Sequence, residues 1–405
     1  MKKISPLKPK IIKSLPEING LSVGVTNCGL KKKPKEDLVL IKLEKSSPIL
    51  GCFTNSKTPG EPIKWNKSII NHGRVSAILI NSGNANVFNG KKGELSLKKI
   101  VKELSLKLNI KEKEIYIAST GVIGELLDET KIIKSIPYLI EDLNNSKNNW
   151  LRAAKAIMTT DTFEKLETSS FKNIVINGIA KGSGMIAPNM ATMLGFVFTN
   201  VKIEKLLLKK VFLDSIEKTF NSITVDGDMS TSDMVLLVSV DGGKTKTLKD
   251  ENDLNLFFKK LNQVLESLSH QIIKDGEGAR KFITIEVSRA KNYKEAKLIA
   301  MSIANSPLFK TAIAGEDSNW GRIVMAIGKV DAKIDVKKLS ISFSKHKILK
   351  NGGLINNIDY NDLDKYLKND NINISIDMGL NYGYSKVWTC DFTEDYISIN
   401  ADYRS

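Results

Sequence analysis

A threonine near the middle of the 405-residue chain stands where its side chain could do chemistry. Thr192 follows a glycine-rich stretch and precedes an apolar, strand-like run at 193–199. A hydroxyl held there can attack the carbonyl carbon of Ala191 and take over the acyl chain as an ester. Hydrolysis of that ester would leave Thr192 as a new N-terminus. On composition alone, a glycine-rich turn that enters a buried strand explains the same residues.

A threonine at a chain terminus carries its own general base. The free α-amine has a pKa of about 7.7 to 8, so it can accept the proton of the same residue's hydroxyl at neutral pH. Such a nucleophile needs no histidine. The sequence predicts no Ser-His-Asp triad and no metal site, because its three histidines are isolated from one another and from cysteines: His72, His270 and His346.

A second glycine-rich segment, at 242–245, resembles the end of a phosphate-binding P-loop. The match fails at its start, because the glycine required five residues before Gly243 is replaced by Val238. The sequence therefore predicts a turn between strands there, without a nucleotide.

The net charge of +16 raises nucleic-acid binding as an alternative function. Only six of the 61 basic residues are arginine, the side chain best suited to forked contacts with phosphates and bases. The scattered lysines instead indicate a solvated surface, so we expect no nucleic-acid partner. No signal-peptide pattern and no apolar run of about 20 residues is present, which predicts a cytoplasmic protein without a membrane partner.

The sequence predicts that Thr192 is positioned by a fold that mixes strands and helices. Buried strands are predicted at 37–43 and 74–81, and another from Lys281 onward. Helical spacing of apolar residues predicts helices at 94–108, 149–158 and 253–273. The fold class is therefore α/β or mixed α+β, in two or three packed units. The most prominent breaks in the pattern are at 177–184 and 351–357.

The segment KGSGMIAPNMATML at 181–194 is similar to the processing signature of the ornithine acetyltransferase family, also called bifunctional glutamate N-acetyltransferases. Seven further segments resemble that family's motifs in the same order, from residue 81 to the end of the chain. They are NSGNAN (81–86), ASTGVIG (118–124), AIMTTDT (156–162), NSITVDGDMSTSD (221–233), DGEGARK (275–281), GEDSNWGRI (315–323) and NADYRS (400–405). The first 80 residues match more loosely.

The resemblance implies a fold of layered sheets flanked by helices, of the N-terminal-nucleophile type. It also implies cleavage between Ala191 and Thr192 into an α chain, 1–191, and a β chain, 192–405, with Thr192 as nucleophile. Thr120 and Gly121 match the family's oxyanion hole, where a hydroxyl and a backbone amide stabilise the tetrahedral intermediate.

Several residues match family positions that contact the amino-acid substrate. A lysine suits the α-carboxylate of the substrate, and a glutamate suits a side-chain ammonium. The chain departs from the family at its last residue, a serine where threonine is common, and at Ser318, where proline is frequent. The substrate-binding positions are Thr159 or Thr160, Lys181, Thr192, Glu277, Asn400 and Ser405.

The implied activity is transfer of an acetyl group from N-acetyl-L-ornithine to L-glutamate through an acetyl-threonine intermediate, without a cofactor. Some family members also take acetyl from acetyl-CoA, and the sequence leaves this open. The α and β chains are expected to stay together in an α2β2 heterotetramer. Two other interpretations stay open: an N-terminal-nucleophile amidase or aminopeptidase that passes the acyl group to water, and a basic nucleic-acid-binding protein.

Overall fold

The computed structural model describes residues 3–187, 193–243 and 245–401. The chain forms two compact units. The large unit contains Lys10–Asn221 and Asp228–Ile272, and the small unit contains Met1–Pro9, Ser222–Gly227 and Ile273–Ser405. The predicted cut after residue 191 falls inside the large unit, so the α and β chains do not correspond to these two units.

Most strands of the large unit form one sheet in the order β4-β3-β2-β9-β7-β6-β5, with β1 paired to β2. The long strand β2 joins its two halves, because residues 38–43 pair with β1 and β3 whereas residues 49–53 pair with β9. Strands β8 and β10 pair separately. The bounds are β1 (Leu21–Thr26), β2 (Leu38–Phe53), β3 (Arg74–Asn84), β4 (Ile115–Val122), β5 (Lys165–Phe171), β6 (Ile174–Lys181), β7 (Leu194–Thr199), β8 (Val201–Lys202), β9 (Met234–Ser239) and β10 (Lys246–Thr247).

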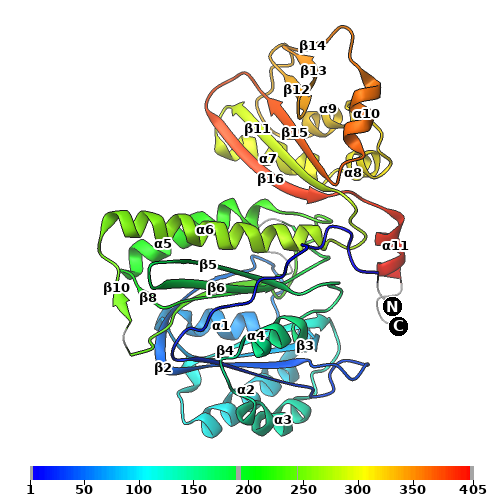
Figure 1. Cartoon of the computed structure of the whole chain (residues 1–405). Coiled ribbons are helices and arrows are strands. Elements are labelled where there is room, and N and C mark those ends of the chain that lie inside the picture. The colour runs from blue at the N-terminus through cyan, green and yellow to red at the C-terminus, as the bar shows by residue number, and fades with distance from the viewer. Residues whose placement is uncertain (1–2, 188–192, 244, 402–405) are drawn as a thin grey trace. The chain divides into compact units, whose positions relative to one another are not determined.

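The two halves of this sheet pack against each other and are flanked by helices (Figure 1). Apolar side chains of β1, β2 and β3 share one core with those of β6, β7 and β9. Helices α2 and α3 form a second core against β2, β3 and β4, while α5 and α6 lie over β5 and β6. The helices are α1 (Glu61–Ile69), α2 (Gly90–Leu108), α3 (Glu129–Glu141), α4 (Lys147–Ala156), α5 (Lys205–Lys218) and α6 (Glu251–Lys274), with short 3₁₀ turns at η1 (Ile70–His72), η2 (Glu112–Glu114) and η3 (Phe220–Ser222).

The central strands β7 and β9 are apolar along their whole length because the sheet is covered on both faces. All six residues of β7 and all six of β9 are buried, so neither strand shows the alternation of a half-exposed sheet. The strand predicted at 193–199 is confirmed, and it begins two residues after the position of Thr192.

The glycine-rich stretch at 177–184 is not the break that its composition predicts. Residues 177–181 lie inside β6. A Cβ on Gly178 would come within 2.7 Å of Leu268 Cδ1 on α6, so this glycine lets the helix pack closely onto the strand. The prediction of a linker was therefore wrong, because the residue that requires the glycine is about 90 positions away in the sequence.

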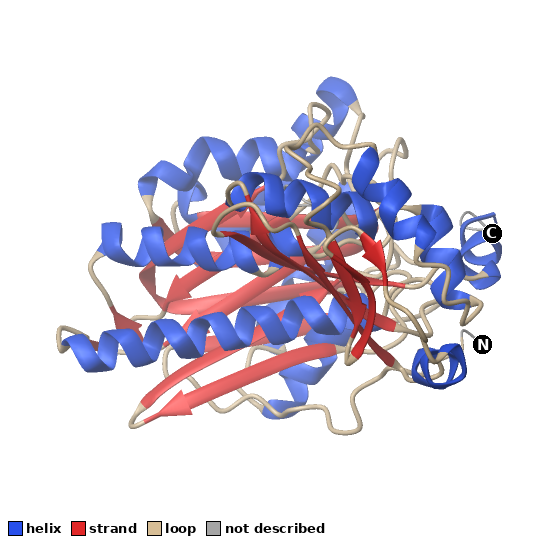
Figure 2. Cartoon of the chain, turned by 90° about the horizontal axis from the view of Figure 1, so that it is seen from above, coloured by secondary structure: helices blue, strands red, loops and turns tan. Residues whose placement is uncertain are grey.

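The small unit is a six-stranded sheet in the order β14-β13-β12-β15-β11-β16, and helices flank strands here as in the large unit (Figure 2). Residues from α7, α8, α9 and α10 pack on one face of the sheet. Its elements are β11 (Phe282–Ala290), α7 (Tyr293–Ala304), α8 (Pro307–Ala314), α9 (Gly321–Gly328), β12 (Ser340–Phe343), β13 (His346–Lys350), β14 (Gly353–Leu354), α10 (Tyr360–Leu367), β15 (Asn371–Asp377), β16 (Gly383–Cys390) and α11 (Glu394–Ala401).

The mixed α/β class is confirmed, as are the helices predicted at 94–108, 149–158 and 253–273, which correspond to α2, α4 and α6. The turn predicted at 351–357 contains the short strand β14. Within the described ranges, no helix is both long enough and apolar enough to span a membrane.

Candidate active site

The predicted oxyanion residues lie together at the end of β4. Thr120 is buried, with 5% of its surface exposed. Gly121 has a φ of +132°, and a Cβ added to it would lie 2.4 Å from the carbonyl carbon of Gly83 on the neighbouring strand β3. Only glycine fits this conformation and this space, since any side chain would displace the β3 backbone. The position of the Gly121 amide is thus determined by the pairing of β3 with β4.

Lys181 is brought to Thr120 from the end of β6. Its Nζ donates a hydrogen bond of 3.1 Å to Thr120 Oγ1, and only 2% of the lysine is exposed. In the sheet register Lys181 pairs with Leu194, the first residue of β7. The structure therefore joins the predicted oxyanion and substrate-binding residues to the strand that follows Thr192.

A buried carboxylate connects this pair to the segment after α4. Asp161 Oδ1 accepts hydrogen bonds of 2.7 Å from Lys165 Nζ and from the backbone amide of Gly182, and Oδ2 accepts one of 3.0 Å from the Thr159 amide. Burial raises the pKa of the Asp161 carboxyl, but the Lys165 and Lys181 ammonium groups outweigh burial and hold that pKa well below its usual range. Asp161 therefore stays ionised and ties Thr159 to the residue next to Lys181.

Replacing Asp161 with asparagine is expected to destabilise the fold strongly. The side chains of Asp161 and Lys165 are both 0% exposed, so the change leaves a buried ammonium without its carboxylate, at a cost of about 3–5 kcal/mol in the free energy of unfolding. Because the native pKa of Asp161 is lowered, its contribution is present above the unfolded-state pKa of about 3.9 and is lost as the pH falls below that value.

Urea unfolding of wild type and Asp161→Asn at pH 7 and pH 3.5 measures both effects. The exposed pair of Lys172 and Asp253 is the control, because Asp253→Asn should cost less than about 1 kcal/mol. A similar small cost for both variants would contradict the role given to Asp161.

Two predicted substrate residues lie in the small unit and contact each other. Asn400 Nδ2, on α11, donates a hydrogen bond of 2.7 Å to Glu277 Oε2, and Glu277 is 7% exposed. Thr160 follows Thr159 and is partly buried. Ala191, Thr192 and Ser405 lie outside the described residues.

Three charged residues near Lys181 were missed by the sequence analysis. Asp161 and Asp233 both belong to segments that match the family, AIMTTDT and NSITVDGDMSTSD, and that membership was the available signal. Lys31 lies near Lys181 and Asp161. Burial, together with the charges of Lys35 and Lys181, lowers the pKa of Lys31 to about 8, and the carboxylates of Asp37 and Asp161 offset only part of this effect. Nothing local in its lysine-rich segment distinguishes it.

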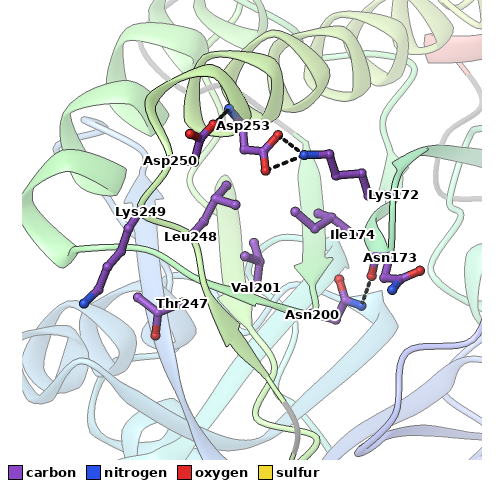
Figure 3. Close-up of a pocket in the computed structure, with 10 residues that line it drawn as sticks. All are labelled: Lys172, Asn173, Ile174, Asn200, Val201, Thr247, Leu248, Lys249, Asp250 and Asp253. Carbon is purple, nitrogen blue, oxygen red and sulfur yellow. Dashed lines mark hydrogen bonds and ion pairs between the residues drawn. The ribbon is translucent and has the colours of Figure 1, made fainter.

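A surface pocket of about 630 Å³ lies at the other end of the same strands and contains none of the predicted site residues (Figure 3). It is lined by Ile174, at the start of β6, which is about 23 Å from Lys181 along the strand. Several of its polar groups bond one another: Lys172 Nζ donates to both Asp253 oxygens at 2.6 and 2.7 Å, and Asn200 Nδ2 donates to the Asn173 carbonyl. This pocket therefore gives no sign of a catalytic role.

Residues 22–405 match the model of the ArgJ family. The chain is 43% identical over 410 residues to the arginine biosynthesis bifunctional protein ArgJ of Bartonella henselae, with 99% of each chain covered. It is 44% identical over 411 residues to the protein of the same name from Bradyrhizobium diazoefficiens, again with 99% of each covered.

Two solved structures are also similar. The crystal structure of ArgJ from Bacillus halodurans is 38% identical, with a TM-score of 0.49, over 51% of this chain and 97% of that one. Ornithine acetyltransferase from Mycobacterium tuberculosis, complexed with ornithine, is 25% identical, with a TM-score of 0.37, over 42% of this chain and 91% of that one. The match to the family model and the full-length relatives show that the chain belongs to the ArgJ family.

Proposed function

We propose that the chain cuts itself between Ala191 and Thr192 and then transfers an acetyl group from N-acetyl-L-ornithine to L-glutamate. The products are L-ornithine and N-acetyl-L-glutamate, which makes the enzyme an acetyltransferase of arginine biosynthesis. Membership of the ArgJ family and the names of its full-length relatives support this reaction.

The hydrogen bond between Lys181 and Thr120 is the observation that carries the proposal furthest. A lysine ammonium has donors but no acceptor, so Thr120 Oγ1 must be the acceptor in this bond. The hydroxyl hydrogen of Thr120 is not used in it and can be donated elsewhere. Thr120 is therefore polarised as an oxyanion donor, and the Gly121 amide, held by the β3–β4 pairing, is the second donor.

The reaction proceeds in two half-reactions. The α-amine of Thr192 takes the hydroxyl proton while Oγ1 attacks the acetyl carbonyl carbon of N-acetylornithine, and the C–N bond to ornithine breaks as its nitrogen regains a proton. The amine of glutamate then attacks the acetyl ester and releases the threonine hydroxyl. Thr120 and Gly121 stabilise the oxyanion that forms in each half-reaction.

The remaining residues are assigned to substrate binding. Lys181 supplies a cation for an α-carboxylate, Glu277 pairs with an ammonium of the substrate, and Asn400 orients Glu277 through their hydrogen bond. Thr159 or Thr160 and Ser405 supply hydroxyls. The cycle needs no cofactor, acetyl-CoA would serve only as an alternative acetyl donor, and the α and β chains would assemble as a cytoplasmic α2β2 heterotetramer.

An assay with N-acetylornithine, with and without glutamate, tests the proposed reaction. We expect N-acetylglutamate to form in step with ornithine, and acetate release to be small, because the acetyl-enzyme passes its acetyl group to an amine. Ornithine and acetate released at the same rate without glutamate would instead identify an amidase. Replacing N-acetylornithine with acetyl-CoA in the same assay determines whether the second donor is used.

A further inference from the structure

Helix α4 ends at Ala156, directly before the segment that is assigned to substrate binding. Residues 157–161, called the substrate segment below, contain the two threonines that are candidates for substrate contact. The last carbonyl groups of a helix have no partner in the helix itself. The carbonyl of Ala156 accepts two side-chain hydrogen bonds, one of 2.8 Å from Lys31 Nζ and one of 2.5 Å from Ser82 Oγ. Two side chains from distant parts of the chain thus hold the point where the substrate segment begins.

Both of these donors are placed by Asp37, whose side chain is buried. Its Oδ1 accepts a hydrogen bond of 2.7 Å from the Cys28 amide, and its Oδ2 accepts bonds of 2.7 and 3.0 Å from the amides of Leu30 and Lys31. The backbone carbonyl of Asp37 accepts a further bond of 2.9 Å from the Ser82 amide. The loop that carries Lys31 is therefore fastened to the strand that carries Ser82.

Ser82 lies beside the proposed oxyanion residue Thr120. The two residues are paired in the register of β3 and β4, so their Cα atoms are about 5 Å apart, and Ser82 is fully buried. A Cβ on Gly83 would come within 2.9 Å of the Leu30 carbonyl oxygen, so the lysine-rich loop packs directly on β3. Through the Ala156 carbonyl, the substrate segment is tied to the same pair of strands that holds Thr120.

The other end of the substrate segment is held by Asp161. Its carboxylate accepts hydrogen bonds from the amide of Thr159 and from the amide of Gly182 at the end of β6. Because the two ends are held by different groups, loss of the bonds at Ala156 would let the segment shift while Asp161 and the helix before it stay in place.

A buried cation is an unusual choice for ending a helix. A neutral hydroxyl, such as that of Ser82, can already bond the carbonyl. Burial, to which the charge of Lys181 adds, lowers the pKa of Lys31 to about 8, even though the carboxylates of Asp37 and Asp161 oppose this. Bringing two ammonium groups near each other is unfavourable for folding, and groups perturbed in this way are common at functional sites.

We propose that Lys31 and Ser82 are positioning residues for substrate binding, which set the place of the substrate segment relative to β3 and β4 through the carbonyl of Ala156. This inference rests on the proposed function, in which Thr159 or Thr160 contacts the amino-acid substrate. Neither Lys31 nor Ser82 has to touch the substrate in this role.

The variant Lys31→Met keeps an unbranched apolar side chain and removes the ammonium. We expect KM for N-acetylornithine and for glutamate to rise about 3- to 10-fold, the range of one weakened neutral hydrogen bond to the substrate. The value of kcat should change less than about twofold, because the oxyanion residues are unaltered. Lys31→Arg keeps a cationic donor and should restore most of the affinity. Steady-state kinetics, expressed per cut chain, measure both constants, and thermal unfolding reports on the fold.

Lys42 offers a matched control on β2. It too is a half-buried lysine whose Nζ donates to a backbone carbonyl, that of Leu43, at 2.5 Å. It pairs with Ala77, which lies about 16 Å along β3 from Ser82. Lys42→Met makes the same chemical change away from the substrate segment, so both KM values should stay at the wild-type level.

The variant Ser82→Ala tests the second donor and covers the case in which Lys31→Met does not fold. It removes one buried hydroxyl with little change in volume, and both KM values should again rise. A lower melting temperature with unchanged KM in either variant would identify an ordinary helix cap and overturn the proposal, as would a loss confined to kcat. A wild-type enzyme that transfers no acetyl group would instead refute the proposed function, so the two ideas fail separately.

Discussion

Replacing Thr192 with alanine is expected to leave one uncut chain of 405 residues with no acetyl transfer. The substitution removes the hydroxyl that is proposed to attack the carbonyl of Ala191, and without the cut the α-amine proposed as general base does not form. Intact-mass measurement of wild type and variant after expression decides this. The wild type should give two fragments, 1–191 and 192–405, that co-purify.

Thr192→Ser is the informative companion, because serine keeps the hydroxyl and loses only a methyl group. It should still cut at the same bond and retain part of the transfer activity. If the alanine variant splits at residue 191, or the wild type stays whole, Thr192 is not the nucleophile.

Replacing Thr120 with alanine is expected to lower the turnover of the processed enzyme about 100- to 1,000-fold, the usual effect of removing one oxyanion donor. The KM for N-acetylornithine should change little, because the hydroxyl acts on charge that develops in the transition state. Steady-state kinetics, expressed per cut chain, measure both quantities.

Thr120→Ser provides the control for packing, since it retains the acceptor for Lys181 and the hydroxyl hydrogen. Most of the activity should return in this variant. Turnover near the wild-type value in Thr120→Ala would remove Thr120 from the mechanism and leave the Gly121 amide as the only proposed donor.

The local pattern of apolar residues was sufficient to predict individual elements. Strand β7 is a continuous apolar run that is buried throughout, and the apolar residues spaced along helix α6 are mostly buried, as their patterns predict. Gly178 shows the limit of this approach, because the atoms that exclude a side chain there belong to a helix far along the chain. The sequence shows where a glycine is, but it does not show which atoms of distant residues pack against that glycine.

The candidate site shows the same limit more clearly. Family motifs identified Thr120 and Lys181 as separate residues, but their hydrogen bond joins β4 to β6 across 61 positions and depends on how the halves of the sheet pack. The burial of Lys181 could not be read from its sequence either. One lysine among many looks like a surface residue until the strands around it are in place.

Strands β6 and β7 are joined through the segment that contains the proposed cut, and six residue pairs hold them side by side. Cleavage changes the molecularity of folding without changing these pairs. Before the cut, the strands meet within one chain at the modest entropic cost of closing a short loop. After it, unfolding would release two polypeptides, so the stability of the processed enzyme depends on its concentration, and reassembly requires two chains to meet. If the proposed cut occurs, the precursor would fold as a single molecule, whereas the processed enzyme would depend on not unfolding.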